Sequence, residues 1–501
     1  MADAVKLHPG DSVAVVLRDM SAGETLSVDG QTITIRESIP YGHKVAVRAM
    51  RPHQPVIKYG DPIGHAIDVV AVGQWVHTHN VRTNLDGTLE YRYERVLPPS
   101  PAPLPSDWSF SGFRRADGSV GVRNEIWILP TVNCVNQIGT LIAQRASKML
   151  GTEEWGDGID GVYSFTHPYG CSQLGEDHRN TQRILAGLAR HPNAAGVLVL
   201  SLGCEDNNLA DFQPILGDYD PQRMVFLTAQ EVEDEIDEGV SLVMQLARRY
   251  ADAEREPLPL SAMKIGLKCG GSDGFSGITA NPLVGRVSDW VTGAGGTTVL
   301  TEVPEMFGAE HLLMNRAVDE AVFHKIVSLI NDFKQYFLDH DQPVDENPSK
   351  GNMTGGITTL EDKSLGCTQK GGTSFVMDVV DYGDPVSTPG LNLLSSPGND
   401  GIAATALAAA GCQLVLFTTG RGTPFGTCVP TVKIATNPRL YNRKQSWMDF
   451  NAGIVLEGET LDFAARQFMD YLMETASGRI AAKNEVLGFR ELVIYKSGVT
   501  V

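Results

Sequence analysis

A proline-rich segment divides this chain of 501 residues into two parts with different sequence patterns. Residues 97–106 read Leu-Pro-Pro-Ser-Pro-Ala-Pro-Leu-Pro-Ser, and five prolines in ten residues exclude a helix there. Such a segment is typical of a stiff, extended linker. The sequence therefore predicts an N-terminal domain over residues 1–96, a linker over residues 97–110 and a larger body after it.

The N-terminal part is predicted to be a small all-β domain. Short β-prone runs, such as Ser12–Leu17, Thr32–Ile35 and Lys44–Ala46, alternate with turns that contain Gly or Pro. No long amphipathic helix pattern interrupts them.

The body alternates apolar, β-branched runs with helical patterns, which is typical of βαβ units and a mainly parallel, Rossmann-like sheet. Strands are expected at 125–132, 161–165, 196–202, 224–227, 264–267, 298–302, 375–380, 391–394, 414–418, 432–435 and Glu491–Tyr495. Helices are expected at 137–149, 181–189, 231–251, 283–292, 309–338, 403–410 and 461–475. A Gly-rich passage over Asn347–Gly372 is expected to be irregular. Residues 111–372 and 373–501 are either two α/β domains or one continuous body.

Composition and charge exclude several classes of protein. Asp and Glu number 60 against 41 Lys and Arg, a net charge of −19, so the chain lacks the basic excess of nucleic-acid-binding proteins. No apolar run approaches the ~20 residues that span a bilayer, and no secretory signal pattern is visible. We expect a cytoplasmic protein without nucleic-acid or membrane partners, and a homo-oligomer remains open.

The positions of the cysteines are informative. The seven cysteines are odd in number and lack a Cys-x-x-Cys pair, which argues against a disulfide framework or a zinc finger. Ligands of open α/β sheets bind beyond the carboxyl ends of the strands, so thiols and carboxylates there could share one crevice. Burial as small apolar side chains is the alternative. The side chains that follow predicted strands are Cys134, Cys171, Cys204, Cys269, Glu302 and Glu305.

Three histidines of the N-terminal part are further candidates. His77 and His79, in Val76-His-Thr-His-Asn80, would share one face of a strand and could bind one metal ion. Two solvated histidines beside a turn are the alternative. His43 follows Pro40 and Gly42 in a predicted turn, where it is either a general base or a hydrogen-bonded imidazole.

Gly-rich loops with polar groups occur at Gly270–Gly274, Ser396–Asp400 and Thr418–Pro424. Backbone N–H groups of such loops favour anionic oxygens, and Arg421 could bind a carboxylate with two hydrogen bonds. Ordinary turn chemistry is the alternative. Motifs for nucleotide binding are not seen.

Long motifs in this chain resemble the altronate/galactarate dehydratase family. In the N-terminal part, Gly42–Ala46 and Lys58–Gly64 resemble a SAF domain, a small β-clip fold. The resemblance covers essentially the whole chain. In the body, the matching stretches are Asn124–Thr131, Tyr169–Gly175, Gly203–Glu205, Cys269–Gly274, Gly277–Pro282, Thr301–Gly308, Leu360–Lys370 and Phe417–Pro424.

The resemblance implies a reaction and a cofactor. Altronate-type members carry His-x-His-Asn after the SAF core, as in His77–Asn80, whereas galactarate-type members usually lack that pair and often have Ser in place of Cys367. The implied reaction is dehydration of D-altronate to 2-dehydro-3-deoxy-D-gluconate in hexuronate (galacturonate) catabolism. It depends on a divalent metal, Fe²⁺ or Mn²⁺. Galactarate or another related sugar acid is the alternative substrate.

Such a dehydration removes the proton on C2, beside a carboxylate, and expels the C3 hydroxyl. A cation on that carboxylate stabilises the enediolate, while a base and an acid transfer the protons. We expect the metal ligands to be His77 and His79, with Cys204 and Glu205 as contributors. For acid/base work His43 is the first candidate and Glu302 the second. Candidates for substrate binding are Asn281, Arg421 and Lys433.

Two other functions are compatible with these residues. An iron–sulfur hydro-lyase would bind its cluster through three of the four thiols Cys134, Cys171, Cys204 and Cys269. A non-catalytic sugar-acid sensor would use the β domain for protein interactions.

Overall fold

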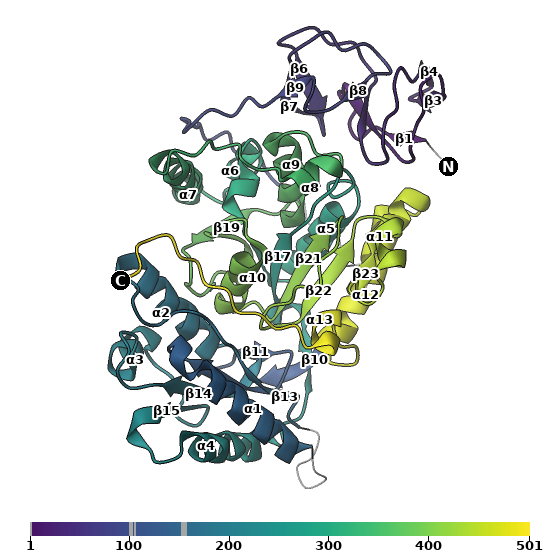
Figure 1. The fold of residues 1–501 in the computed structure, drawn as a ribbon. Coiled ribbons are helices and arrows are strands. Elements are labelled where there is room, and N and C mark those ends of the chain that lie inside the picture. The colour runs from purple at the N-terminus through teal and green to yellow at the C-terminus, as the bar shows by residue number, and fades with distance from the viewer. Residues whose placement is uncertain (1–2, 100–103, 105–106, 152–157) are drawn as a thin grey trace.

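The computed structural model describes residues 3–99, 104, 107–151 and 158–501. Three groups of antiparallel strands form the N-terminal domain, at the top of Figure 1. The four-stranded sheet has the order β1-β2-β5-β8 (Ala4–Val5, Val13–Val16, Lys44–Ala46, Trp75–Val76). The others are the hairpin β3-β4 (Thr25–Val28, Gln31–Thr34) and the sheet β6-β7-β9 (Pro55–Lys58, Asp61–Ala66, Val81–Arg82). The prediction of an all-β N-terminal domain is confirmed.

A four-stranded parallel sheet lies at the opposite end of the molecule (Figure 1). Its order is β13-β12-β14-β15 (Gly161–Ser164, Glu125–Pro130, Ala194–Ser201, Met224–Thr228). Helices α1 (Asn136–Leu150) and α4 (Glu235–Tyr250) pack on one face, and α2 (Gly175–Ala189) and α3 (Leu209–Leu216) on the other. Because both faces are covered, the apolar strand β14 is buried along its whole length.

A seven-stranded parallel sheet occupies the middle of the molecule, in the order β19-β20-β18-β17-β21-β22-β23. Its strands are Val376–Val380, Gly390–Leu394, Thr297–Leu300, Lys264–Cys269, Leu414–Thr419, Thr431–Ala435 and Phe450–Asn451. The associated helices are α5 (Ala280–Gly293), α6 (Glu310–Met314), α7 (Glu320–Asp339), α8 (Lys350–Thr354), α9 (Leu360–Cys367), α10 (Asp400–Ala409), α11 (Pro438–Arg443), α12 (Leu461–Ala476) and α13 (Lys483–Leu487). Strands from both sides of residue 372 pair in this sheet, so it is continuous across that position.

The two parallel sheets share a hydrophobic core. Residues of α2, such as Leu188, cluster with residues of α10, such as Leu407. The helices approach closely at Gly187, where a Cβ atom would lie 2.3 Å from the Ala409 carbonyl oxygen. A small antiparallel sheet, β11-β10-β16 (Val120–Gly121, Ser109–Arg114, Glu256–Pro259), accompanies this junction. The α/β body is therefore one packed unit with two sheets.

The proline-rich segment lies partly outside the described residues, at 100–103 and 105–106. The segment that precedes it in the chain contacts the α/β body. Tyr93 Oη donates to the Ala317 carbonyl at 2.7 Å, and Val96 N donates to the Asn315 carbonyl at 2.7 Å. Strand β10 begins at Ser109, within the end of the predicted linker.

Two expectations about local structure are wrong. The passage Asn347–Gly372 is not irregular, because it contains α8 and α9. Thr359 caps α9 by accepting a hydrogen bond from Asp362 N. Every residue of α9 is buried, so the helix lacks the alternation of apolar and polar faces by which a surface helix is predicted. The segment Glu491–Tyr495 is not a strand: Glu491 makes a single bridge to Thr427. In addition, the helical pattern over 309–338 is split into α6 and α7, with Asp319 capping α7.

No helix within the described part of the chain is both long enough and apolar enough to cross a membrane.

Candidate functional site

The centre of the seven-stranded sheet has the topology of a ligand site. Strands β17 and β21 are neighbours, although the chain forms β18, β19 and β20 between them. Such a switch in strand order opens a crevice at the carboxyl ends of the strands, where open α/β sheets bind ligands. Cys269 is the last residue of β17, and Glu302 and Glu305 follow β18. The predicted strand-end position of these three residues is therefore confirmed.

Two thiols and a carboxylate meet at this edge. Cys269 Sγ lies 3.0 Å from Glu305 Oε2 and 3.4 Å from Cys367 Sγ, and Cys367 Sγ lies 3.2 Å from the same carboxylate oxygen. Among the described residues, this is the one group of three or more His, Cys, Asp or Glu ligand atoms that all lie within 4.8 Å of one another. All three side chains are buried. Cys367 comes from the end of α9, which packs on the turn after β18.

Two buried lysines neutralise this group. Lys370 Nζ donates to Cys269 Sγ at 3.0 Å, and Lys363 Nζ forms an ion pair with Glu305 Oε1 at 2.7 Å. Burial alone would raise the pKa of Glu305, but the two lysines lower it to about 2. The hydrogen bond with the Cys367 thiol, helped by both lysines, lowers the pKa of Cys269 to about 6. The pKa of Cys367 is raised well above its ordinary value, first because of its hydrogen bond with Cys269 and then because of burial.

This arrangement fits a bound divalent cation. Cys269 Sγ and the Glu305 carboxylate lie 3.0 Å apart, so once Cys269 is deprotonated the two groups repel each other unless positive charge lies beside them. The lysines supply that charge in the structure, and a metal ion bound between the same three atoms would supply it equally. Cysteine and glutamate are both metal ligands. Cys269, Glu305 and Cys367 are therefore the candidate metal ligands.

A second carboxylate, Glu302, lies behind the group. It accepts hydrogen bonds from Lys268 Nζ at 3.0 Å and from Cys269 N at 2.8 Å. Its burial raises its pKa above the ordinary value, and Lys268 opposes that shift. Lys268 Nζ also contacts Asp400 Oδ1 at 2.7 Å, and Asp400 is partly exposed at the start of α10. Lys268 thus connects the buried Glu302 with a carboxylate that reaches solvent.

A cleft of about 530 Å³ leads from solvent to this group. Glu305 and Lys363 lie at the cleft wall, and the residues beyond them come from loops that follow β17 and β20, from the segment before α8 and from α7. The polar groups that line it include Glu305, Glu346, Asn352, Lys363, Asn399 and Asp400. A small polyhydroxylated acid would meet both charges and hydrogen-bonding groups there.

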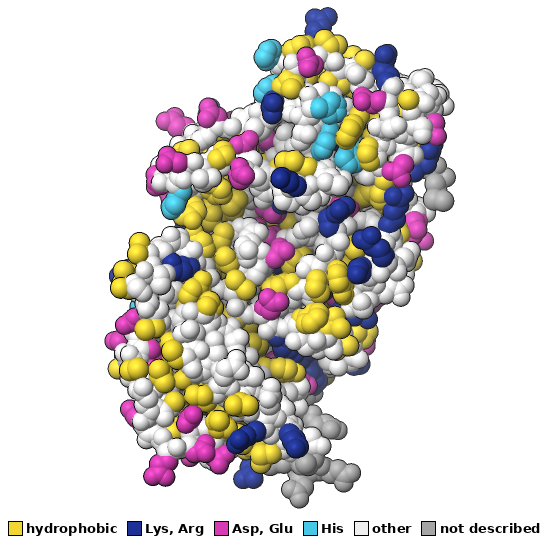
Figure 2. Space-filling model, viewed as in Figure 1, with side chains coloured by type: hydrophobic (Ala, Val, Ile, Leu, Met, Phe, Trp, Pro, Cys, Tyr) yellow, Lys and Arg dark blue, Asp and Glu magenta, His cyan; other side chains and the backbone are white. Residues whose placement is uncertain are grey.

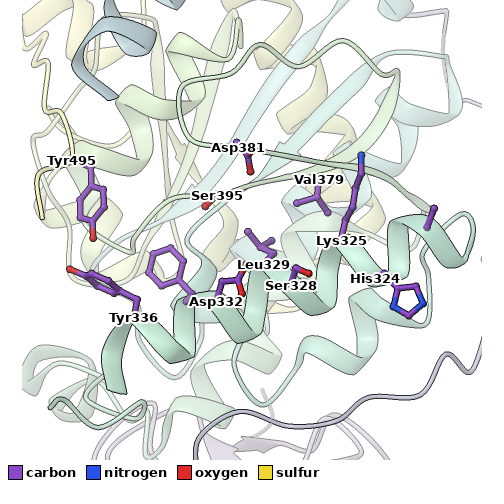
Figure 3. Close-up of a pocket in the computed structure, with 12 residues that line it drawn as sticks. His324, Lys325, Ser328, Leu329, Asp332, Tyr336, Val379, Asp381, Ser395 and Tyr495 are labelled. Carbon is purple, nitrogen blue, oxygen red and sulfur yellow. The ribbon is translucent and has the colours of Figure 1, made fainter. Parts of the chain in front are cut away.

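A larger cavity, of about 640 Å³, lies beside this cleft on the outer face of α7 (Figure 3). The two cavities share the side chains of Phe333, Tyr336 and Tyr495. Figure 3 shows Tyr336 and Tyr495 facing each other at one end, with Lys325 farther along α7. Lys325 pairs with Asp378 at 2.7 Å and is 55% exposed. Water screens such charges, so an anion would gain less from Lys325 than from the buried Lys363 of the cleft.

The histidines of the N-terminal domain lie at its contact with the body. His43 accepts a hydrogen bond from Trp75 Nε1 at Nδ1 and donates from Nε2 to the Thr354 carbonyl at 3.1 Å. Burial lowers its pKa. Both ring nitrogens therefore have hydrogen-bond partners in the structure. This agrees with the second of the two interpretations of His43, a hydrogen-bonded imidazole rather than a free general base.

The premise that His77 and His79 share a strand face is wrong. Strand β8 ends at Val76, and the two histidines lie in the turn after it. His77 is buried with Nδ1 3.1 Å from Thr358 Oγ1, whereas His79 is exposed. Figure 2 shows histidine side chains on the surface of this domain.

Cys204 and Glu205 are not near those histidines. They follow β14, at the other end of the molecule from β8 (Figure 1). Glu205 accepts hydrogen bonds from Thr131 Oγ1 and Ser201 Oγ, each at 2.6 Å, and from two backbone N–H groups. The Glu205 carboxylate therefore stabilises the loop in which it lies. Cys134 and Cys171 also belong to the four-stranded sheet, so the expected single crevice is two separate places.

The predicted substrate-binding residues differ in position. Asn281 is fully buried and accepts from Thr418 Oγ1 at 2.6 Å, and Lys433 Nζ donates to the Phe425 carbonyl at 2.8 Å. Neither lines the cleft. Arg421 is exposed, and its backbone N donates to the carbonyl of Gly271, a cleft residue. Figure 2 shows Lys and Arg side chains gathered on the side of α11 near the N-terminal domain, a local reversal of the net negative charge.

Sequence reasoning did not single out Lys363, Lys370 or Cys367 as members of the candidate site. All three belong to the stretch 360–370, which matched the family motif but lay in the passage expected to be irregular. The sequence signal that could have indicated them is the run Lys363–Cys367, which places a lysine and a cysteine on one short helix after the capping residue Thr359.

Comparison with known proteins agrees with this architecture. Three family descriptions match successive parts of the chain: "Altronate/galactarate dehydratase SAF domain" over residues 2–84, "D-galactarate dehydratase/Altronate hydrolase, second domain" over 112–251 and "D-galactarate/Altronate dehydratase, C-terminal" over 260–500. The altronate dehydratase of Escherichia coli K12 is 54% identical over 497 residues, 99% of both chains.

The chain belongs to the altronate/galactarate dehydratase family. The altronate dehydratase of Bacillus subtilis 168 is 54% identical over 502 residues and all of both chains. The galactarate dehydratase (L-threo-forming) of Escherichia coli K12 is 33% identical over 490 residues, 95% of this chain and 93% of its own. The resemblance drawn from the motifs is confirmed, and so is the SAF domain at the N-terminus.

Proposed function

We propose that this protein is a hydro-lyase that converts D-altronate to 2-dehydro-3-deoxy-D-gluconate with the help of a divalent metal. Sequence identity supports the substrate, because two altronate dehydratases match at 54% along the whole chain and a galactarate dehydratase at 33%. The observation that carries the chemistry is the buried group of Cys269, Glu305 and Cys367, which reaches a polar cleft through Glu305 and Lys363.

The donor set favours iron. Thiolate ligands suit Fe²⁺ better than Mn²⁺, which prefers carboxylate and water oxygens. When bound, such an ion would stabilise the enediolate that forms as the C2 proton leaves. Metal binding by proteins also requires deprotonated ligands, and the lowered pKa values of Cys269 and Glu305 favour that state.

The chain's own residues bind and orient the substrate. Lys363 is the cation at the cleft wall, so it would pair with the carboxylate of the sugar acid and hold C2 beside the buried group. Arg421, next to the Gly271 loop, would bind distal hydroxyl groups. Together these contacts would hold the substrate in one orientation. That lowers the activation barrier by more than the binding energy of the separate contacts, because the entropy of orienting the substrate is lost on binding and not in the reaction step.

Proton transfer is assigned to carboxylates at the same edge. Asp400 lines the cleft, and Lys268 connects it with Glu302. We propose that Asp400 exchanges protons with the substrate. Glu302, through its ion pair with Lys268, would influence how readily Asp400 gains or loses a proton. His43, with both nitrogens engaged, would take part in proton transfer only after its contacts with Trp75 and Thr354 open.

The direct test is an anaerobic assay of the purified protein with Fe²⁺ or Mn²⁺ and either D-altronate or galactarate. We expect the 2-keto-3-deoxy acid to form from altronate, faster with Fe²⁺ than with Mn²⁺. Turnover of galactarate in preference to altronate would overturn the substrate, and binding of either acid without turnover would indicate a sensor.

A further inference from the structure

Three cysteines that the proposed reaction does not use come together on the four-stranded sheet. Cys134, Cys171 and Cys204 each lie in the loop that follows one of the neighbouring strands β12, β13 and β14. Because these strands are parallel and adjacent, their three loops share one edge of the sheet. Cys269, the fourth thiol of the predicted set, belongs to the other sheet.

Hydrogen bonds tie the three loops together. Asn133 N donates to the Tyr169 carbonyl at 2.9 Å, and Asn207 N donates to the Gly170 carbonyl at 3.0 Å. The side chain of Asn207 closes the third side by donating to the Thr131 carbonyl at 3.0 Å. The approach is so close that a Cβ atom on Gly170 would lie 2.0 Å from the Thr131 oxygen. The positions of the three cysteines are therefore fixed relative to one another.

These three thiols differ from the other cysteines in exposure. Cys134, Cys171 and Cys204 are exposed, whereas the remaining four are buried. Unpaired cysteine is among the residue types most often buried. Burial raises the pKa of Cys412 and of Cys428 to about 12, as expected of inert core thiols. Three exposed thiols on linked loops have no such role in the core.

Helix ends and amide groups surround the same loops. Helix α1 begins at Asn136 and α2 at Gly175, just after Cys134 and Cys171, and the N-terminal end of a helix favours a thiolate. One amide donor in these loops, Gln173 Nε2, is buried without a hydrogen-bond partner among the described residues. An amide N–H group is the kind of donor that bridging sulfide accepts.

We propose that Cys134, Cys171 and Cys204 bind an iron–sulfur cluster of the [4Fe–4S] type. A single tetrahedral metal ion needs thiolates about 4 Å apart, and these three sulfur atoms do not form a group within 4.8 Å. A cluster bridges wider gaps, because its own iron and sulfide atoms lie between the cysteines. Three protein ligands leave the fourth iron for water or a small anion. The cluster enters by ligand exchange, in which each thiol gives its proton to the thiolate that it displaces from iron.

The site is separate from the proposed dehydratase site, so the two proposals can fail independently. The C-terminal tail lies beside the cysteine loops: Val501 N donates to the Ser172 carbonyl at 3.1 Å, and Thr500 bridges to Gln173. Figure 1 shows the C-terminus next to α2. The protein to test is therefore the chain of 501 residues with nothing added after Val501.

The test is anaerobic reconstitution of the full-length protein with ferric iron, dithiothreitol and sulfide, followed by removal of unbound iron. We expect about four iron atoms and four acid-labile sulfides per chain, with visible sulfide-to-iron absorbance. Each of the variants Cys134→Ser, Cys171→Ser and Cys204→Ser should lose most of the sulfide and the absorbance. Cys367→Ser, in the buried group of the other sheet, should retain both.

Alkylation provides a second measurement that needs no variant. In the reconstituted protein the three thiols should resist iodoacetamide, and they should react after the cluster is removed, as read residue by residue by mass spectrometry. Iron bound without sulfide, sulfide that persists in the three Ser variants, or thiols that remain reactive in the reconstituted protein would each overturn the proposal. Altronate turnover of the same samples reports on the other site.

Discussion

At the scale of single residues, Lys363 is where the buried group meets the cleft. Its ammonium pairs with Glu305 at 2.7 Å and is 7% exposed. We expect Lys363→Met to lower kcat/KM for altronate by about 100-fold or more, because a substrate carboxylate would lose its cation in a site of low dielectric. Lys363→Arg keeps the charge and should recover part of the loss. Steady-state kinetics of the metal-loaded enzyme provide the measurement.

The neighbouring cavity supplies a matched control for that experiment. Lys325 also lines a cavity and pairs with an aspartate at 2.7 Å, but it is exposed. Lys325→Met should leave kcat/KM within about twofold, since a solvated pair contributes little. If Lys325→Met abolished turnover and Lys363→Met did not, the larger cavity would be the active site.

Residue by residue, the sequence indicates one half of the candidate site. Cys269, Glu302 and Glu305 could be found because parallel strands deliver their last residues to a common edge. Lys363 and Cys367 come from α9, and Lys370 comes from the 3-10 turn after it, more than 50 residues away from Glu305 in the chain. Their approach depends on tertiary packing, and no local pattern encodes it.

At the scale of elements, α9 is the part that joins the N-terminal domain to the site. Asp362, in its first turn, pairs with Lys44 at 2.7 Å and with Lys58 at 2.8 Å, and all three side chains are buried. Burial lowers the pKa of Lys44 to about 8. Burial alone would raise the pKa of Asp362, but the two lysines hold it well below its ordinary range. The N-terminal domain thus fixes the helix that carries Lys363 and Cys367.

Asp362→Asn should be strongly destabilising. It leaves two buried ammonium groups without a charge partner, which typically costs about 3–5 kcal/mol. We expect a lower midpoint of urea unfolding and a lower kcat/KM, because α9 would no longer hold Lys363 and Cys367 in place. Glu256→Gln breaks the exposed pair with Arg114 and should change stability by less than about 1 kcal/mol. Equal effects of the two variants would refute this role of α9.

The same helix shows why element prediction fails where it does. Strands such as β14 and β21 were predictable, because buried parallel strands are continuous apolar runs. Helix α9 carries Glu361, Asp362 and Lys363 in its first turn, yet it is buried on every side. The N-terminal part of the chain supplies partners for Glu361 and Asp362, whereas Lys363 pairs with Glu305 of the body. Because these distant partners compensate the charges, the amphipathic period that identifies a surface helix is missing.

At the scale of the whole molecule, the sequence pattern does not indicate which strands belong to which of the two parallel sheets. The predicted β/α pattern shows no break between residues 228 and 264, where the first sheet ends and the second begins, and only strand pairing shows that β12–β15 and β17–β23 are separate sheets. The shared core then joins them. His191 belongs to that junction: its ring stacks on Trp127, accepts from Asn193 N and donates from Nε2 to the Cys412 carbonyl at 3.1 Å.

This buried histidine should make the junction sensitive to acid. Burial lowers the pKa of His191 to about 3, from 6.5 in a solvated histidine. Between these values the unfolded chain binds a proton that the folded chain does not, so stability falls as the pH falls from 6.5 toward 3. One such group contributes a slope of ~1.4 kcal/mol per pH unit. His191→Gln should remove that part of the slope in urea unfolding between pH 6.5 and pH 4.

His324→Gln is the control, because this histidine lies on the exposed surface of α7 and not at the junction. Its side chain is 67% exposed, and His324→Gln should leave the slope unchanged. A comparison of slopes also separates the junction from the candidate site, since neither His191 nor His324 lines the cleft. If His191→Gln and wild type lost stability in parallel below pH 6.5, a charged His191 would be tolerated at the junction. The two sheets would then not depend on a neutral imidazole to stay packed together.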